Sequence, residues 1–343
     1  MKKTKILHII TRLANGGADE NTIYTINGLD KNCYDVDLII GEHNVDKMIK
    51  KIDKDIKVYR VKGLIREISP LNEIKAFIKI YKIIKINNYD IVHTHIAKAG
   101  VLGRTAAKLA KIPIIIHTVH GTTFPDTINI ISKKLFKNIE RLCGKYTDFF
   151  ITVGEDMKRK YIDANIGHPE KYKTIYSGMN LNTFFNTSEY SNKKINLIKD
   201  KYNIKKDDIV IGNISKLQKR KGYDYFIDIA QNLLKKHNNL TFLIVGNGPY
   251  ENQLKSKVKK LNLQNSIKFT GYVDNVEEIF AIIDIKVLTS LWEGLPRVLI
   301  QAAASSKPIV TFDVDGAWEI VKNGKNGFIV PIRDSNLMTE KID

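Results

Sequence analysis

The feature that most constrains the fold is a repeated alternation between short apolar runs, rich in β-forming residues, and longer stretches with helical periodicity. The runs are continuously apolar, as is typical of parallel strands that helices cover on both faces. Strands with one face exposed to solvent instead alternate between apolar and polar residues. The pattern predicts an α/β fold of the doubly wound type, which binds ligands at the carboxyl ends of its strands. The strands predicted first along the chain are 5–11, 35–40, 56–61, 90–93, 112–117 and 148–153.

The alternation is interrupted once and then restarts, which predicts two domains, 1–183 and 184–343. The segment Thr174–Phe185, TIYSGMNLNTFF, breaks the pattern with Gly and Asn, and the polar, lysine-rich stretch Ser188–Asp208 follows it. A chain of 343 residues is long enough for two domains with a core each. Strands are predicted next at 208–214, 240–245 and 307–311, with a short apolar run at 282–288 and a turn at 326–331.

Composition narrows the protein class. A hydrophobic share of 43% is typical of globular domains. No apolar run reaches the ~20 residues that a membrane helix needs, and the amino-terminal ILHII is shorter than the ~7–15 residues of a signal-peptide core. Two cysteines, Cys33 and Cys143, form no disulfide framework, which favours a reducing cytoplasm.

The formal net charge of +18 has three interpretations. Lysine, isoleucine and asparagine are all abundant, so codon bias could supply much of the charge. A basic face toward anionic lipid is the second interpretation. Nucleic-acid binding is the third, and no motif or basic–aromatic interleaving supports it.

The stretch 73–86, EIKAFIKIYKIIKI, predicts a basic amphipathic helix. It is either a helix that covers a sheet and turns its lysines to solvent, or one that contacts an anionic membrane. Its predicted apolar face holds Ile74, Phe77, Ile78, Tyr81 and Ile84, and its lysine face holds Lys75, Lys79, Lys82 and Lys85.

The segment Ser290–Gln301, SLWEGLPRVLIQ, carries the strongest chemical signal. Pro296 suits the first position of a helix, where its missing N–H costs nothing. A helix N-terminus can hold a phosphate, while Glu293 just before it would repel phosphate and accept hydrogen bonds from hydroxyls. The combination suits a nucleotide-sugar. The alternative is an ordinary strand–loop–helix unit in which Glu293 caps the helix.

Three other loops follow predicted strands. In SKLQKRKG, Lys216 and Lys221 could neutralise a diphosphate, or the cluster could be a basic surface. Paired glycines, Gly16 and Gly17, would let a ligand approach the backbone, although a plain turn explains them equally well. The GNGP segment, 246–249, taken alone is only weak evidence for a ligand-binding loop.

Histidines end two neighbouring predicted strands: His93 and His95 in one, His117 and His120 in the other. Because successive side chains of a strand point to opposite faces, His93 and His95 are predicted to lie on one face of their strand. A metal site is not expected, because no Cys, Asp or Glu stands beside them and no ligand spacing is evident. Neutral imidazoles at a sheet edge suit hydroxyls and phosphates. A core or supporting role is expected for His93 and His117.

The motifs GGAD, HTH, HTVHG, KLxxxKG, GNGP and EGLP occur in this order between residues 5 and 334. Together they resemble the GT4 family of retaining glycosyltransferases, also called glycosyl transferases group 1. The resemblance implies a GT-B architecture, in which two doubly wound Rossmann-like domains face each other across a cleft. The amino-terminal domain would take the acceptor and the carboxyl-terminal domain the nucleotide-sugar.

The resemblance also implies roles for individual residues. His120 and Glu293 would be catalytic and hold the donor sugar. No metal and no cofactor is implied beyond a UDP- or GDP-linked sugar as co-substrate. The donor diphosphate would be bound by Gly16, Gly17, Lys216, Lys221, Leu295 and Pro296, and the sugar and nucleotide by Gly246, Gly248, Val273, Gly294 and Gln301.

Three features depart from the family pattern. Gln301 replaces its second glutamate, so weaker donor binding is expected. Lys216 replaces its arginine, which keeps the charge but loses the bidentate geometry. Asp313 and Asp315 have the spacing of a DxD motif, but they fall in the segment that the family writes TDVGG. The sequence stops at Asp343, where relatives usually continue into crossover helices, so a truncated chain or altered domain closure is expected.

The expected activity is retaining transfer of a sugar to a lipid-linked or polysaccharide acceptor in cell-surface glycan synthesis. We expect the protein in the cytoplasm, with a peripheral position at the inner face of the membrane, and we expect no nucleic-acid partner. Three alternatives remain open: a non-catalytic nucleotide-sugar-binding protein, a sugar-nucleotide epimerase of the same architecture, and a nucleic-acid binder suggested only by charge.

Overall fold

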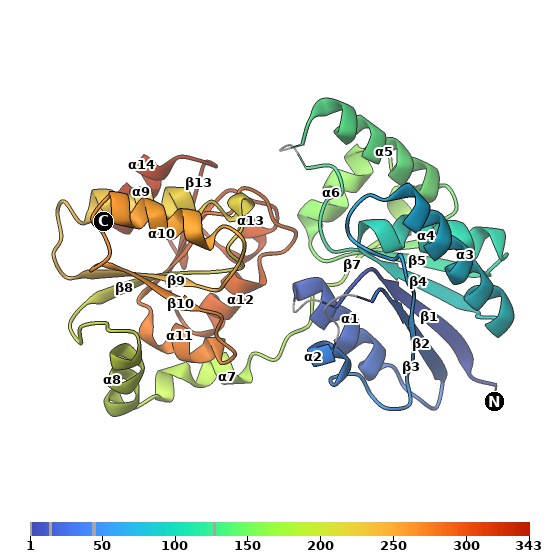
Figure 1. Ribbon diagram of the computed structural model, residues 1–343, viewed down its shortest axis with the longest axis horizontal. Coiled ribbons are helices and arrows are strands. Elements are labelled where there is room, and N and C mark those ends of the chain that lie inside the picture. Colours follow the sequence, from blue (N-terminus) through green and yellow to red (C-terminus); the bar gives the residue numbers. More distant parts are fainter. Residues whose placement is uncertain (1, 14–15, 43–45, 126–127) are drawn as a thin grey trace. The chain divides into compact units, whose positions relative to one another are not determined.

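The computed structural model describes residues 2–13, 16–42, 46–125 and 128–343 (Figure 1). The chain divides into two compact units, Met1–Met179 and Asn180–Asp343. Both contain a parallel sheet between layers of helices, which is the α/β class that the alternating pattern predicts.

The first unit contains a seven-stranded parallel sheet with the order β3-β2-β1-β4-β5-β6-β7. The six strands predicted from apolar runs correspond to β1 to β6. The prediction missed β7, because it has three residues and its middle residue is an exposed lysine. The strands are β1 Thr4–Ile10, β2 Tyr34–Ile40, β3 Lys57–Arg60, β4 Ile91–His95, β5 Ile114–Val119, β6 Phe149–Thr152 and β7 Tyr172–Thr174.

Helices cover both faces of this sheet because successive strand residues point to opposite sides. In β1, Leu7 and Ile9 pack against α3 and α4, while Ile10 packs toward α1 on the other face. The helices of the unit are α1 Gly17–Gly28, α2 Asp46–Ile49, α3 Pro70–Asn87, α4 Ala97–Leu109, α5 Ile130–Gly144 and α6 Glu155–Asp163, with the 3₁₀ turn η1 Pro169–Lys171.

The predicted apolar face of α3 is wrong in part. Its buried residues are Ala76, Ile80 and Ile84, which repeat every four positions and meet α4 and the sheet. Ile74 and Ile78 are 58% and 47% exposed. The apolar stripe of this helix is therefore wider than the face that the sheet can cover.

The second unit contains a six-stranded parallel sheet with the order β10-β9-β8-β11-β12-β13. The prediction of a turn at 326–331 is wrong, since Gly327–Val330 pairs with β12 as the edge strand β13. The other strands are β8 Ile209–Ile214, β9 Leu240–Val245, β10 Ile267–Gly271, β11 Ile285–Leu288 and β12 Ile309–Phe312.

Helices again lie on both faces. The side of α9 that packs on the sheet includes Phe226, Ile229 and Leu233, which are all buried. Within the described part of the chain, no helix combines the length and the apolar character needed to cross a membrane. The helices are α7 Asn182–Phe185, α8 Asn192–Lys201, α9 Tyr223–Leu233, α10 Glu251–Lys260, α11 Val276–Ile282, α12 Arg297–Ala304, α13 Ala317–Ile320 and α14 Ser335–Ile342, with the 3₁₀ turns η2 Asn186–Glu189 and η3 Lys219–Lys221.

Candidate functional site

Three loops meet at the carboxyl edge of the second sheet, because β8 lies between β9 and β11. The loop after β8 is tied to the loop after β9 by a hydrogen bond from Leu217 N to Asn247 O, 2.8 Å long. It is tied to the loop after β11 by a bond of 2.9 Å from Leu291 N to Arg220 O. The motifs KLxxxKG, GNGP and EGLP, far apart in the sequence, therefore form one continuous edge.

Two glycines at this edge are required by the packing of the loops themselves. A Cβ on Gly248 would lie 2.1 Å from Leu217 O. Gly222 has φ +63°, and a Cβ there would lie 2.0 Å from Thr289 O. A side chain at either position would push the loops apart. Gly248, predicted to bind the donor, thus also has a structural role that needs no ligand.

An ion pair joins two of the three motifs. Lys221 Nζ contacts Glu293 Oε1, and the side chains are only 11% and 13% exposed. Arg220 Nη1 lies 3.9 Å from the other carboxylate oxygen, Oε2. Burial raises the pKa of Glu293, but attraction by Lys221 and Arg220 outweighs it and holds the pKa below its usual range. Glu293 is therefore a carboxylate at neutral pH.

The helix after EGLP begins differently from the prediction. Pro296 occupies the N-cap of α12, and Arg297 is the first helical residue. The alternative in which Glu293 caps this helix is wrong, since no side-chain cap bond is present among the residues that the structure describes. Glu293 instead points to the lysine loop.

The two predicted lysines differ in environment. Lys216 is exposed, whereas Lys221 is buried and its carbonyl accepts a hydrogen bond of 3.1 Å from Thr289 Oγ1. Beneath Lys221 lies Lys286, which is fully buried and which the sequence analysis missed. Its Nζ donates a hydrogen bond to Val287 O at 2.5 Å. Burial is the larger cause that lowers the pKa of Lys286 well below its usual value, and repulsion by the Lys221 charge is the smaller one. The sequence signal that could have identified Lys286 as buried is that it is a single lysine inside the apolar run of β11.

The remaining predicted donor residues lie along the same edge. Gly246 and Gly248 follow β9, and Val273 follows β10. Gly294, Leu295 and Pro296 follow β11, and the half-buried Gln301 lies in α12. The structure thus gathers the residues other than Gln301 after the strand ends of one sheet, and their contacts with a donor stay a prediction.

In the first unit, the predicted glycine pair starts α1. Gly16 is the N-cap and Gly17 the first helical residue, and Gly16 N donates to Asp19 Oδ2 at 2.8 Å. The acid of the GGAD motif therefore holds its own loop in place through the return bond of a capping box, whose forward bond a glycine cannot make.

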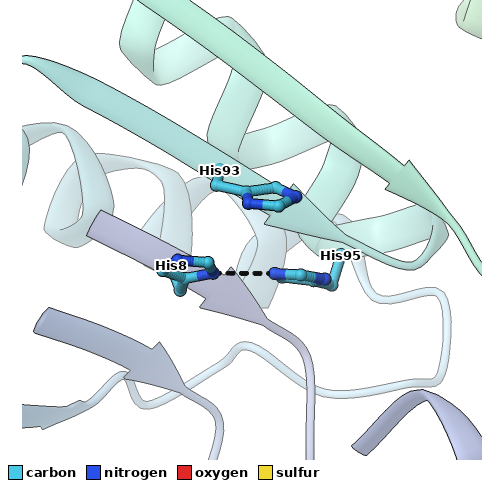
Figure 2. A group of neighbouring side chains, drawn as sticks. All are labelled: His8, His93 and His95. Atoms are coloured by element: carbon cyan, nitrogen blue, oxygen red, sulfur yellow. Dashed lines mark hydrogen bonds between the residues drawn. The ribbon is translucent and has the colours of Figure 1, made fainter. Parts of the chain in front are cut away.

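Histidines from two strands, and one from the loop after a third, gather on the face of this sheet that carries α1. His93 and His95 lie on one side of β4, as predicted, with ring centroids 4.3 Å apart. His8 of the neighbouring β1 joins them, and its Nδ1 lies 2.9 Å from His95 Nε2 (Figure 2). The half-buried His120, beyond the end of β5, places Nε2 3.1 Å from His95 Nδ1. His93 Nε2 instead lies 2.7 Å from Thr118 Oγ1.

Burial keeps His8, His93 and His95 neutral. It lowers the pKa of His8 to about 3 and those of His93 and His95 well below their ordinary range, where the neighbouring rings add to the effect. One ring nitrogen from each of these three lies within 4.8 Å of the others, a grouping that could hold a metal ion. His8 was not predicted to belong to this group, because only the β1–β4 pairing brings it to His93.

His117 faces the opposite side of the sheet. Its Nδ1 lies 2.9 Å from Thr94 Oγ1, and its ring packs so closely on α4 that a Cβ on Gly100 would lie 2.5 Å from it. This residue is part of the core between β5 and α4.

Comparisons with known proteins cover both units. Two family profiles match: glycosyl transferase 4-like over residues 13–153 and glycosyl transferases group 1 over residues 194–343. An Escherichia coli protein named UDP-Gal:alpha-D-GlcNAc-diphosphoundecaprenol alpha-1,3-galactosyltransferase is 30% identical over 337 residues, which cover 97% of this chain and 85% of that protein.

Two further similarities agree with these. The capsular polysaccharide biosynthesis glycosyltransferase CapM of Staphylococcus aureus is 26% identical over 349 residues, covering 100% of this chain and 88% of CapM. The crystal structure of HepE from Anabaena in complex with UDP-glucose matches with a TM-score of 0.80 at 22% identity, covering 99% of this chain and 90% of HepE.

Proposed function

Because the chain belongs to the GT4-type glycosyltransferases and has their two-domain GT-B fold, we propose that it transfers a sugar from a UDP-linked donor to a lipid-linked acceptor in cell-surface glycan synthesis. Its homologues are glycosyltransferases of cell-surface glycan synthesis, one of them named for a diphosphoundecaprenol-linked substrate. The proposal includes retention at the anomeric carbon and a cytoplasmic location at the inner face of the membrane.

The observation that carries the proposal is the Lys221–Glu293 pair at the carboxyl edge of the second sheet. A donor diphosphate there would meet Lys221 and Arg220, which can neutralise the charge that grows on the leaving group. The Glu293 carboxylate would then be released to accept hydrogen bonds from sugar hydroxyls. In this proposal the protein's own cations stabilise the departing diphosphate, and Lys216 adds to them from the exposed end of the loop.

Calorimetric binding of UDP, GDP, ADP and their sugar conjugates tests the donor site. We expect UDP and one UDP-sugar to bind, and Lys221→Ala to weaken binding by about tenfold or more, since a charged hydrogen bond contributes about 1.5–3 kcal/mol. Lys219→Ala is the matched control, because Lys219 is exposed on the same loop. Equal affinity of the Lys221 and Lys219 variants would contradict the assigned site.

Transfer itself needs a second assay. A UDP-sugar that binds is incubated with a diphosphopolyprenol-linked sugar, and the anomeric configuration of the product is read by NMR. A product with the donor's configuration supports retention, and an inverted product contradicts it. Conversion of the donor without any acceptor would instead identify an epimerase.

The first unit offers a surface suited to an anionic membrane. At the start of α5, Ile130 and Ile131 are 81% and 78% exposed, and lysines 133, 134 and 137 lie on the same helix. On α3, which lies on the other side of α4, Ile74 and Ile78 are exposed among lysines (Figure 1). Exposed apolar side chains flanked by lysines are typical of helices that lie in the headgroup region.

Cosedimentation with lipid vesicles tests this part of the proposal. We expect binding to vesicles containing anionic lipid and loss of binding in the double variant Ile130→Asp/Ile131→Asp. Leu197→Asp is the control, because Leu197 is an exposed apolar residue on α8 of the other unit. Loss of binding in both variants, or in neither, would contradict a specific role for α5.

A further inference from the structure

The strands β8 and β11 separate before they reach the carboxyl edge of the second sheet. Within the residues that the structure describes, they pair at only two positions, and Lys286 with Gly212 is the last of them. On its other side, β8 stays paired with β9 as far as Ile214. The strand order reverses at β8, since the chain continues to β9 on one side and later reaches β11 on the other. Open α/β sheets bind ligands at such a point, outside the carboxyl ends of the strands.

Side chains connect the two strands beyond their last backbone pair. Asn213 Nδ2 donates to Thr289 Oγ1 at 3.0 Å, and Thr289 Oγ1 donates to Lys221 O at 3.1 Å. Lys286 Nζ donates to Val287 O at 2.5 Å and to Asn213 Oδ1 at 3.5 Å, the long limit of a hydrogen bond. Asn213, Thr289 and Lys286 are all 0% exposed. The amine of Lys286 therefore belongs to a buried network that ends at the loop of Lys221.

The surroundings of this amine suit its neutral form. A neutral amine has two N–H donors and an ammonium has three, and the described residues offer Lys286 Nζ two acceptors. Among the described residues, the Glu293 carboxylate is paired with Lys221 and forms no ion pair with Lys286. Burial, the largest cause, and the charge of Lys221 lower the pKa of Lys286 well below its ordinary value, against a smaller attraction by Glu293. The site therefore favours the uncharged amine.

The other ionisable groups around the network lie on several elements. They are Lys221, Arg220 and Glu293 at the carboxyl edge, Tyr223 on α9, and Asp284 and Lys307 at the opposite end of the sheet, just before β11 and β12. The hydroxyl of Tyr223 contacts the carbonyl of Asn213 at 3.5 Å, and burial raises the pKa of Tyr223, so the phenol is uncharged. At the carboxyl edge two cations face one carboxylate, which leaves a positive balance. An anion bound at this edge would reverse that balance.

We propose that Lys286 takes up a proton when the diphosphate of the donor binds at the loop of Lys221, so that a neutral amine becomes an ammonium that offsets part of the ligand's negative charge. The inference rests on the proposed function for the position of the diphosphate, and every residue that it uses belongs to the second unit. The proton comes from the solvent and returns to it when the nucleotide leaves. Because binding favours the protonated amine, affinity is highest below the pKa that Lys286 has in the free protein and falls as the pH rises above it.

Calorimetry of UDP binding at pH 8.0, in HEPES and in Tris, measures the proton directly, because the two buffers have different heats of ionisation. The terminal phosphate of UDP ionises at about pH 6, so the nucleotide itself takes up no proton under these conditions. We expect uptake of about one proton for each UDP bound to the wild type, and about none in Lys286→Met. Lys219→Ala is the matched control, because Lys219 is exposed on the same turn, and this variant should keep the uptake.

NMR of the wild-type protein, with its lysines labelled with carbon-13 at Cε, reports the charge of the amine without relying on a variant that must fold. We expect one lysine resonance with the shift of a neutral amine at pH 8.0, and we expect it to move to the ammonium position when UDP is added. Its absence from the spectrum of Lys286→Met assigns it. Ammonium shifts for all lysines of the free protein would overturn the proposal, because Lys286 would then be a permanent cation.

The pH dependence of affinity separates proton uptake from a purely structural role. The Kd for UDP should rise about tenfold between pH 8 and pH 9 in the wild type, and by less than about twofold in Lys286→Met. A structural lysine would instead change stability or affinity equally at both pH values. UDP binding without proton uptake, or uptake that persists in Lys286→Met, would overturn this inference and leave the proposed function intact. If UDP does not bind, the proposed donor site fails and this inference falls with it.

Discussion

Acid should destabilise the first unit strongly, because four of its histidines are buried as neutral rings. These are His8, His93, His95 and His117, and burial is the largest cause of the lowered pKa of each. The unfolded chain binds protons at these rings below its ordinary pKa of 6.5, while the folded unit does not, down to about 3 for His8. The stability that these neutral rings contribute is therefore fully present above pH 6.5 and is lost as the pH falls below that value.

The magnitude follows from the number of rings. Each unit of pH below the pKa of histidine in the unfolded chain lowers the free energy of unfolding by about 1.4 kcal/mol for each buried ring. At pH 5.5 the four together should lower the free energy of unfolding by about 5 kcal/mol, relative to pH 7.5. Since whole domains are stable by only about 5–15 kcal/mol, the first unit should be close to unfolding.

Urea unfolding at pH 7.5 and 5.5, with hydrogen exchange in β1, β4 and β5 to localise the loss, measures this effect. Carboxylates contribute little to the pH dependence of stability above pH 5.5, so the change between pH 7.5 and 5.5 reports mainly on the histidines. His93→Leu should reduce the pH-dependent loss by about 1.4 kcal/mol. His168→Asn should leave it unchanged, because His168 is exposed. A loss below about 1.5 kcal/mol in the wild type, the share of a single ring, would refute the reasoning.

Three further predictions concern single positions. Gln301→Glu should tighten binding of the donor about fivefold in calorimetry, since a charge-assisted hydrogen bond exceeds a neutral one by about 1 kcal/mol, and unchanged affinity would contradict it. Glu140→Ala should lower the free energy of unfolding by about 3–5 kcal/mol, because it leaves the buried Arg104 without the carboxylate 2.7 Å away; a loss below about 1 kcal/mol would show that the pair is not needed. Gly222→Ala should destabilise by about 1–3 kcal/mol, whereas Gly28→Ala, where a Cβ meets no atom within 4 Å, should not; thermal unfolding compares them.

Much of the fold was predictable because its signals are local. Parallel strands covered on both faces must be apolar throughout, so β1 to β6 and most strands of the second unit stand out as continuous runs. The order of the six motifs predicted the family and the two-domain GT-B fold. Short edge strands escaped the same reasoning, because β7 and β13 have too few buried residues to form a run.

The sites were predictable only in part. The motifs named Lys221 and Glu293, but only the order β9-β8-β11 shows that their loops meet and that the two side chains form an ion pair. Lys216 and Lys221 look alike in the sequence, yet one is exposed and the other buried. Local pattern assigns a residue to an element, whereas burial depends on which other elements cover it.

The sequence by itself determined the class of fold, the sequence of strands and helices, and the loops that carry polar side chains, since each follows from periodicity over a few residues. Tertiary structure alone decided which distant residues share an environment. His8 became the partner of His95, and Lys286 came to lie beneath Lys221, because parallel strands pair across long crossovers. No local pattern contains the register of that pairing, and the register sets both the charge and the hydrogen-bonding state of these groups.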